Sequence, residues 1–109
     1  MGAKNWNDLA DIADVVTLTP EDEKCLEEVQ RVIEAHNLTA KFGVALLHKH
    51  FDIGADEILL EITFAAEKRL EIRPVLAEGV DLKQVMTTIW RFDGGARYGC
   101  SYCNRDHHT

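Results

Sequence analysis

The spacing of apolar residues changes at Lys41, and this change constrains the fold more than any other feature of the sequence. Before Lys41, apolar residues recur every three or four positions, which is typical of amphipathic helices. After it they recur at every second position, which is typical of strands with one buried face. Helices followed by strands predict an α+β fold, with two N-terminal helices packed on a mostly antiparallel sheet of about five strands. Closure of that sheet into a small barrel is an open alternative.

Two helices are expected in the first third of the chain. Apolar residues at helical spacing predict the first over residues 6–16. The second begins at Thr19, because Thr is a good N-cap, Pro20 fits the first helical position, and the acidic residues that follow favour the positive end of the helix dipole. Its apolar stripe reaches residues 35–36, where Asn37 is a plausible C-terminal cap.

Five strands are expected after this, at residues 42–51, 58–64, 70–75, 85–92 and 96–103. The second and third form a hairpin by their short connection, and Asp93-Gly94-Gly95 predicts another hairpin between the last two. Pro74 cannot donate a hydrogen bond to a neighbouring strand, which places it at a sheet edge or a strand end.

Length and charge limit the classes of protein to consider. The chain has 109 residues and is expected to form one domain over residues 1–109. Its net charge of -7 disfavours nucleic acid and anionic membranes as partners, because an acidic surface repels phosphate. Three cysteines are an odd number and do not form a secreted disulfide framework, so a cytoplasmic location is expected.

His48 and His50 end the longest apolar run of the chain. In an extended strand, residues two apart share a face with β-carbons roughly 7 Å apart, so the two imidazoles could converge on one ion. The alternative is that one histidine is a hydrogen-bonded strand end and the other is exposed. Glu57 and Glu61 follow closely, and either could be an oxygen ligand or a partner that orients an imidazole. The alternative is that both are solvated strand residues.

Cys100 and Cys103 form a Cys-x-x-Cys pair, and His107 lies four residues further on. Two thiolates and a nearby imidazole at short spacing are typical of zinc sites. One alternative is a redox-active dithiol, and another is a pair of small buried thiols before a frayed tail.

Together these residues predict a small cytoplasmic metal-binding protein. The expected ligands are His48, His50, Cys100 and Cys103 with His107 in addition, and the expected ion is Zn²⁺ or another divalent transition metal. One alternative is a metal-dependent enzyme acting on a small-molecule substrate. Another is a protein–protein interaction module without metal, which uses a sheet edge or a charged face to form a homodimer.

Overall fold

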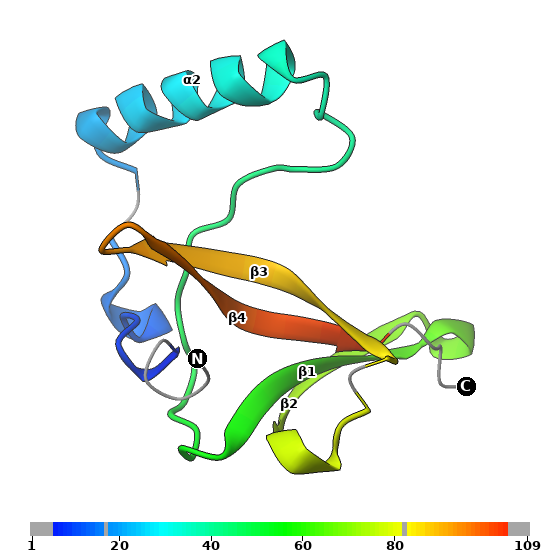
Figure 1. Ribbon diagram of the computed structural model, residues 1–109. Coiled ribbons are helices and arrows are strands. Elements are labelled where there is room, and N and C mark those ends of the chain that lie inside the picture. Colours follow the sequence, from blue (N-terminus) through cyan, green and yellow to red (C-terminus); the bar gives the residue numbers. More distant parts are fainter. Residues whose placement is uncertain (1–5, 17, 82, 105–109) are drawn as a thin grey trace. The chain divides into compact units, whose positions relative to one another are not determined.

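The computed structural model describes residues 6–16, 18–81 and 83–104 and divides the chain into two compact units. One unit is Ala10–His48, and the other combines Met1–Leu9 with Lys49–Thr109. Figure 1 labels helix α2 of the first unit and the four strands of the second. These units do not test whether the chain forms one domain, so the single domain expected from its length stays a prediction. In the described parts, no helix combines the length and the apolar character needed to cross a membrane.

The main element of the first unit is helix α2 (Pro20–Ala35), and its start is as predicted. Thr19 is the N-cap and accepts a hydrogen bond from the Asp22 amide at 3.1 Å, while the Asp22 carboxylate accepts one from the Thr19 amide at 3.0 Å. This reciprocal capping box satisfies two backbone donors that the helix itself leaves free.

The end of α2 is also as predicted, since Asn37 adopts a left-handed conformation with φ 57°. The Asn37 amide donates to the Glu34 carbonyl at 3.0 Å, and the Leu38 amide donates to the Ile33 carbonyl at 3.1 Å. These two bonds form a Schellman motif, in which Asn takes the position usually held by Gly.

The first expected helix does not form as one element. Trp6 and Asn7 belong to a helical turn, and residues Ile12–Asp14 form a separate 3₁₀ helix, η1. The Asp11 side chain accepts a hydrogen bond from the Ala13 amide at 3.0 Å and so caps η1. Short polar side chains that bond to nearby backbone compete with a continuous helix, which explains the interruption.

The strand expected at residues 42–51 is also wrong, because residues 42–48 have no regular secondary structure and lie outside the sheet. Within its unit, Val44 lines an apolar groove together with Leu26, Val29 and Ile33 of α2. Val44 therefore lies beside a helix and not beside a strand, although it stays 60% exposed.

The second unit contains a sheet of four strands, β1 (Glu57–Phe64), β2 (Arg69–Leu76), β3 (Val85–Asp93) and β4 (Ala96–Asn104), with 3₁₀ helices η2 (Ala65–Glu67) and η3 (Ala77–Gly79) in its connections. The strand order is β2-β1-β4-β3, and the sheet does not close into a barrel. Both predicted hairpins are confirmed, as β1 and β2 are antiparallel and so are β3 and β4. β1 and β4 join the hairpins in parallel, so the sheet is mixed and the fold is α+β with one α-helix longer than a turn among the described residues.

Local chemistry explains two details of the sheet. Gly94 and Gly95 link β3 to β4 with φ angles of 58° and 80°, as a type I′ turn requires. Pro74 lies on β2, which is an edge strand of the sheet, so its missing N–H is tolerated as expected.

Apolar side chains cover both faces of the central strand β1. Ile58 and Leu60 pack with Tyr102 on one face. On the other face Leu59, which is 1% exposed, packs with Ile53 and with Trp6 from the N-terminal turn. The core of this unit is thus centred on β1 and leaves the outer strand β2 with less cover.

Candidate functional site

The segment that follows His50 is held by hydrogen bonds from the N-terminal turn of the same unit. Trp6 donates its indole N–H to the Phe51 carbonyl at 2.8 Å. The Asn7 side-chain amide donates to the Ile53 carbonyl at 3.0 Å and accepts from the Ile53 amide at 2.9 Å. An Asn side chain has one donor group and one acceptor, so it pairs with the backbone as a neighbouring strand would.

Lys49, between the histidines, has the most enclosed charge of this segment. Its ammonium donates to the Asn7 carbonyl at 2.6 Å and to the Asp52 carboxylate at 2.5 Å, and its side chain is 16% exposed. The sequence alone does not predict this role for Lys49. Its position between the histidines gave no signal, because its partner Asn7 is distant in sequence.

The two histidines do not share a strand face, because no strand forms there. The His48 Nδ1 lies 2.8 Å from the Leu46 carbonyl, within the first unit. His50 belongs to the second unit and is exposed. The convergence that strand alternation predicts for this pair therefore has no structural basis in the segment itself.

Cys100 and Cys103 both lie on β4, and the strand keeps them apart. Three residues of extended chain separate their Cα atoms by roughly 10 Å, whereas two thiolates at about 2.3 Å from one zinc ion must lie close together. His107 lies outside the described residues. Within residues 6–16, 18–81 and 83–104, no three side chains of His, Cys, Asp or Glu are grouped so that they could hold a metal ion.

Cys103 nevertheless has a carboxylate neighbour. It is the Cα partner of Glu61 in the parallel pairing of β4 with β1. The Thr88 hydroxyl donates to the Glu61 carboxylate at 3.1 Å, and the Cys103 thiol donates to the Asn104 carbonyl at 3.5 Å. Burial raises the pKa of the Cys103 thiol, and the charge of Glu61 raises it further.

Burial also raises the pKa of the Cys100 thiol, and the opposing effect of Arg91 is smaller. Reactive dithiols need a lowered pKa, since the thiolate is the nucleophile. Both cysteines of the pair therefore favour the protonated form, and this property does not support a redox switch.

The outer edge of β2 is a second candidate site. The Ala77 amide donates to the Asp56 carbonyl at 2.9 Å, and these residues continue the β1–β2 register in which Leu76 opposes Glu57. Hydrogen-bonded and non-hydrogen-bonded pairs alternate in an antiparallel ladder. Every second residue of β2, counted back from Ala77, therefore bonds to β1, and these residues are Val75, Arg73, Glu71 and Arg69. The intervening residues are Leu70, Ile72, Pro74 and Leu76. Their backbone groups lie in the plane of the sheet and point away from β1, toward the open edge.

The same four residues place their side chains on one face of β2. Leu70 is 54% exposed, Ile72 is 50% exposed and Leu76 is 49% exposed. Among the described residues, no strand pairs with this edge. Exposed apolar side chains in a row beside free backbone groups are features of a strand that can accept another strand.

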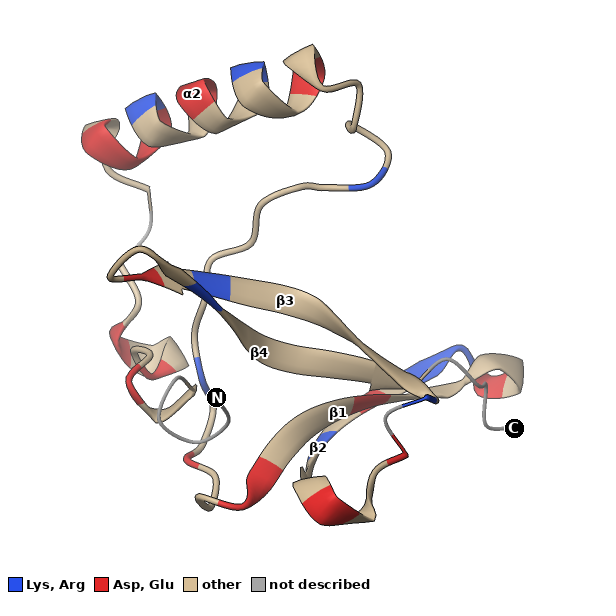
Figure 2. Ribbon diagram, viewed as in Figure 1, with Lys and Arg blue, Asp and Glu red and all other residues tan. Residues whose placement is uncertain are grey.

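The opposite face of β2 carries alternating charges from Arg69, Glu71 and Arg73. Figure 2 colours the basic residues blue and the acidic residues red along the ribbon. Glu71 lies between two arginines and forms an ion pair with Arg69 on one side and a longer one, at 3.7 Å, with Arg73 on the other. β2 thus has a net positive charge of one within an acidic protein.

The sequence matches no protein-family model, and the comparisons found neither a similar curated protein nor a similar solved structure.

Proposed function

We propose that this protein is a protein–protein interaction module, in which the outer edge of β2 accepts an extended strand from another chain. The proposal is supported above all by the outward-pointing backbone groups of Leu70, Ile72 and Leu76, which coincide with their half-exposed side chains. In strand addition, backbone hydrogen bonds provide affinity and alternate side chains provide specificity. β2 offers both on the same four residues.

The expected binding is weak and reversible. Each new backbone hydrogen bond contributes a net ~0.5–1.5 kcal/mol, and β2 has only three outward N–H donors. Pro74 lacks the fourth donor, so a long uninterrupted ladder cannot form along this edge. Proline and charged residues on an edge strand also limit uncontrolled aggregation, which is compatible with a short, specific partner strand.

The test uses a capped synthetic peptide with the sequence of residues 68–77, KRLEIRPVLA, added to the full-length protein. We expect NMR shift changes confined to β2 and its neighbours, with slower hydrogen exchange at the Leu70, Ile72 and Leu76 amides. The control is the same peptide with N-methyl groups on the amides that bond to the protein. Unchanged β2 signals at millimolar peptide would show that this edge does not accept a strand.

A second candidate function is metal binding, and the pairing of Glu61 with Cys103 favours it. A carboxylate and a thiolate on adjacent strands could provide two ligands to Zn²⁺. The wider ligand set of His48, His50, Cys100, Cys103 and His107 stays a prediction, as does a metal-dependent enzyme that uses the same ion.

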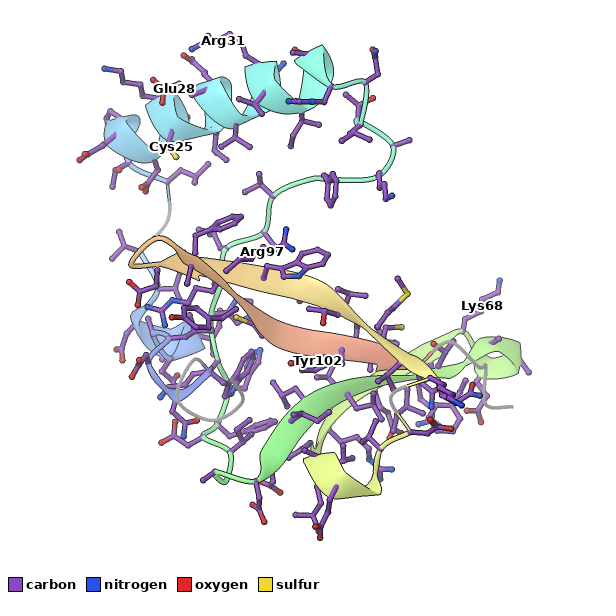
Figure 3. All side chains as sticks on the ribbon, in the orientation of Figure 1. Cys25, Glu28, Arg31, Lys68, Arg97 and Tyr102 are labelled. Carbon is purple, nitrogen blue, oxygen red and sulfur yellow. The ribbon has the colours of Figure 1, made fainter. Side chains whose placement is uncertain are left out.

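Elemental analysis of untagged protein after incubation with zinc and gel filtration tests this second candidate. We expect one ion per chain, lost in Cys103→Ser and Glu61→Gln and retained in the control Cys25→Ser, because Cys25 lies on α2 (Figure 3). Metal content that is absent in the parent protein, or equal in all variants, would reject the Glu61–Cys103 site.

A further inference from the structure

We propose that the strand accepted by β2 is β2 of a second copy of this chain, antiparallel to the first and with Ile72 opposite the partner's Ile72. This inference rests on the proposed function, and it specifies both the partner and the register. It depends on two properties of β2, namely which backbone groups point outward and how the charges alternate.

Hydrogen-bond geometry restricts the registers. In an antiparallel pair, a residue whose backbone groups point toward the partner must oppose a residue of the same kind. Leu70, Ile72, Pro74 and Leu76 point outward, so they must oppose one another. The twofold axis relating two copies of β2 therefore passes through a residue and not between two residues.

Among the registers centred near the middle of β2, the charges that come to lie opposite each other favour one. An axis at Glu71 places two glutamates opposite each other, and an axis at Arg73 places two arginines opposite each other, which is unfavourable. An axis at Ile72 instead places Glu71 opposite the partner's Arg73, and this favourable pair occurs twice by symmetry.

The registers centred further along β2 lose backbone pairing. An axis at Leu70 leaves a short overlap, because η2 (Ala65–Glu67) and the left-handed Lys68 (φ 53°) precede the strand. An axis at Pro74 places two residues without an N–H at the centre of the ladder. Only the Ile72 register combines opposite charges with an overlap that extends over most of β2 (Arg69–Leu76).

In the Ile72 register the two central residues exchange both of their backbone hydrogen bonds. Each Leu70 amide donates to the partner's Pro74 carbonyl, so the missing Pro74 N–H costs only the return bond. On the apolar face, the Ile72 side chains of the two copies meet, and Leu70 packs beside the partner's Pro74. The half-exposed row of β2 thereby gains an identical row at its side.

Cysteine cross-linking tests this register in full-length protein that also carries Cys25→Ser, since Cys25 is exposed. Ile72→Cys places two thiols directly opposite, with Cα atoms about 5.5 Å apart, within the range of a disulfide. Leu70→Cys is the matched control on the same face, because two copies of residue 70 are offset by roughly 13 Å. We expect a covalent dimer after mild oxidation for Ile72→Cys and none for Leu70→Cys or the parent.

Charge reversal gives an independent measurement by sedimentation. We expect Glu71→Arg to weaken dimerisation about tenfold, because both cross-strand ion pairs become arginine pairs. The double variant Glu71→Arg/Arg73→Glu restores opposite charges and should recover dimerisation. A similar loss in the single and double variants would overturn the assigned register.

These outcomes separate the partner from the proposed function. If the 68–77 peptide binds to β2 but the protein sediments as a monomer at millimolar concentration, the second copy is rejected and strand acceptance stands. If the protein dimerises but Leu70→Cys cross-links as well as Ile72→Cys, the register is rejected. If the peptide does not bind at all, the proposed function fails and this inference fails with it.

Discussion

Glu61 and Cys103 lie side by side on β1 and β4, as Cα partners in the parallel pairing that joins the two hairpins of the sheet. Thr88 of β3 donates its hydroxyl to the Glu61 carboxylate at 3.1 Å. The carboxylate is therefore held close to a partly buried thiol. Because a neighbouring negative charge disfavours the thiolate, the pair has measurable consequences for the chemistry of Cys103.

Replacement of Glu61 should make the Cys103 thiol more reactive. In Glu61→Gln the negative charge is removed, so the pKa of Cys103 falls, but it stays above its usual 9.0 because burial is the larger cause of the shift. The measurement is the pH dependence of alkylation at Cys103, followed by mass spectrometry of the peptide that contains it. Glu57→Gln is the control, because Glu57 pairs with Leu76 away from Cys103. A Cys103 profile that does not move in Glu61→Gln would contradict the prediction.

Stability should decrease at alkaline pH. Burial raises the pKa values of Cys100 and Cys103 above 9.0 and that of Tyr102 above 10.0 in the folded protein. Above the usual values the unfolded chain releases these protons while the folded protein still holds them, so stability falls as the pH rises toward the folded pKa values.

Urea unfolding under reducing conditions at pH 8 and pH 10.5 measures this effect. We expect a lower midpoint at the higher pH. In a Cys100→Ala/Cys103→Ala variant the urea midpoint should decrease by less between the two pH values, because, of these three groups, Tyr102 alone remains. Equal losses in the variant and the parent would show that the two thiols do not contribute.

Removal of the α2 cap should destabilise the helix. Thr19→Ala loses the hydroxyl that accepts the Asp22 amide hydrogen bond, which costs about 1 kcal/mol. Thr19→Ser keeps a hydroxyl and serves as the control. We expect a smaller helical signal in circular dichroism and a lower unfolding midpoint for the alanine variant alone. Equal effects of alanine and serine would assign the loss to the threonine methyl group.

Local signals in the sequence predicted the parts of the fold that depend on neighbouring residues. Thr19 and Asn37 at the ends of α2, and Gly94 and Gly95 in the β3–β4 turn, act within a few residues, so their effect is visible without tertiary structure. The alternation in residues 42–51 was misleading because a strand needs a partner strand, and the sequence does not show whether one is available.

The candidate sites depend on longer-range pairing. Residue type makes Glu61 and Cys103 potential ligands, but their adjacency results from the parallel pairing of β1 with β4, which no local pattern specifies. The alternation of Leu70 and Ile72 with charged residues was visible in the sequence. The orientation of that face required the strand order, which also decides that β2 is an edge strand, one of the two positions that Pro74 allows.

The contact between Asn7 and Ile53 provides a final test, because two substitutions should separate its two hydrogen bonds. The Asn7 side-chain oxygen accepts from the Ile53 amide at 2.9 Å, and its nitrogen donates to the Ile53 carbonyl at 3.0 Å. Asn7→Asp keeps an acceptor but places a carboxylate oxygen against a carbonyl oxygen. Asn7→Ala removes both bonds and leaves the part-buried Ile53 groups without a partner, at a cost of about 1–3 kcal/mol.

Hydrogen exchange at the Ile53 amide distinguishes the two variants. We expect protection in the parent, partial protection in Asn7→Asp, and fast exchange in Asn7→Ala together with a lower unfolding midpoint. The Asn7 amide thus replaces a missing strand partner for the segment that precedes β1, and it helps to hold Ile53 against Leu59 in the core. If the Ile53 amide exchanges equally slowly in all three proteins, another group must fix this segment, and Trp6, which donates to the Phe51 carbonyl, is the residue to replace next.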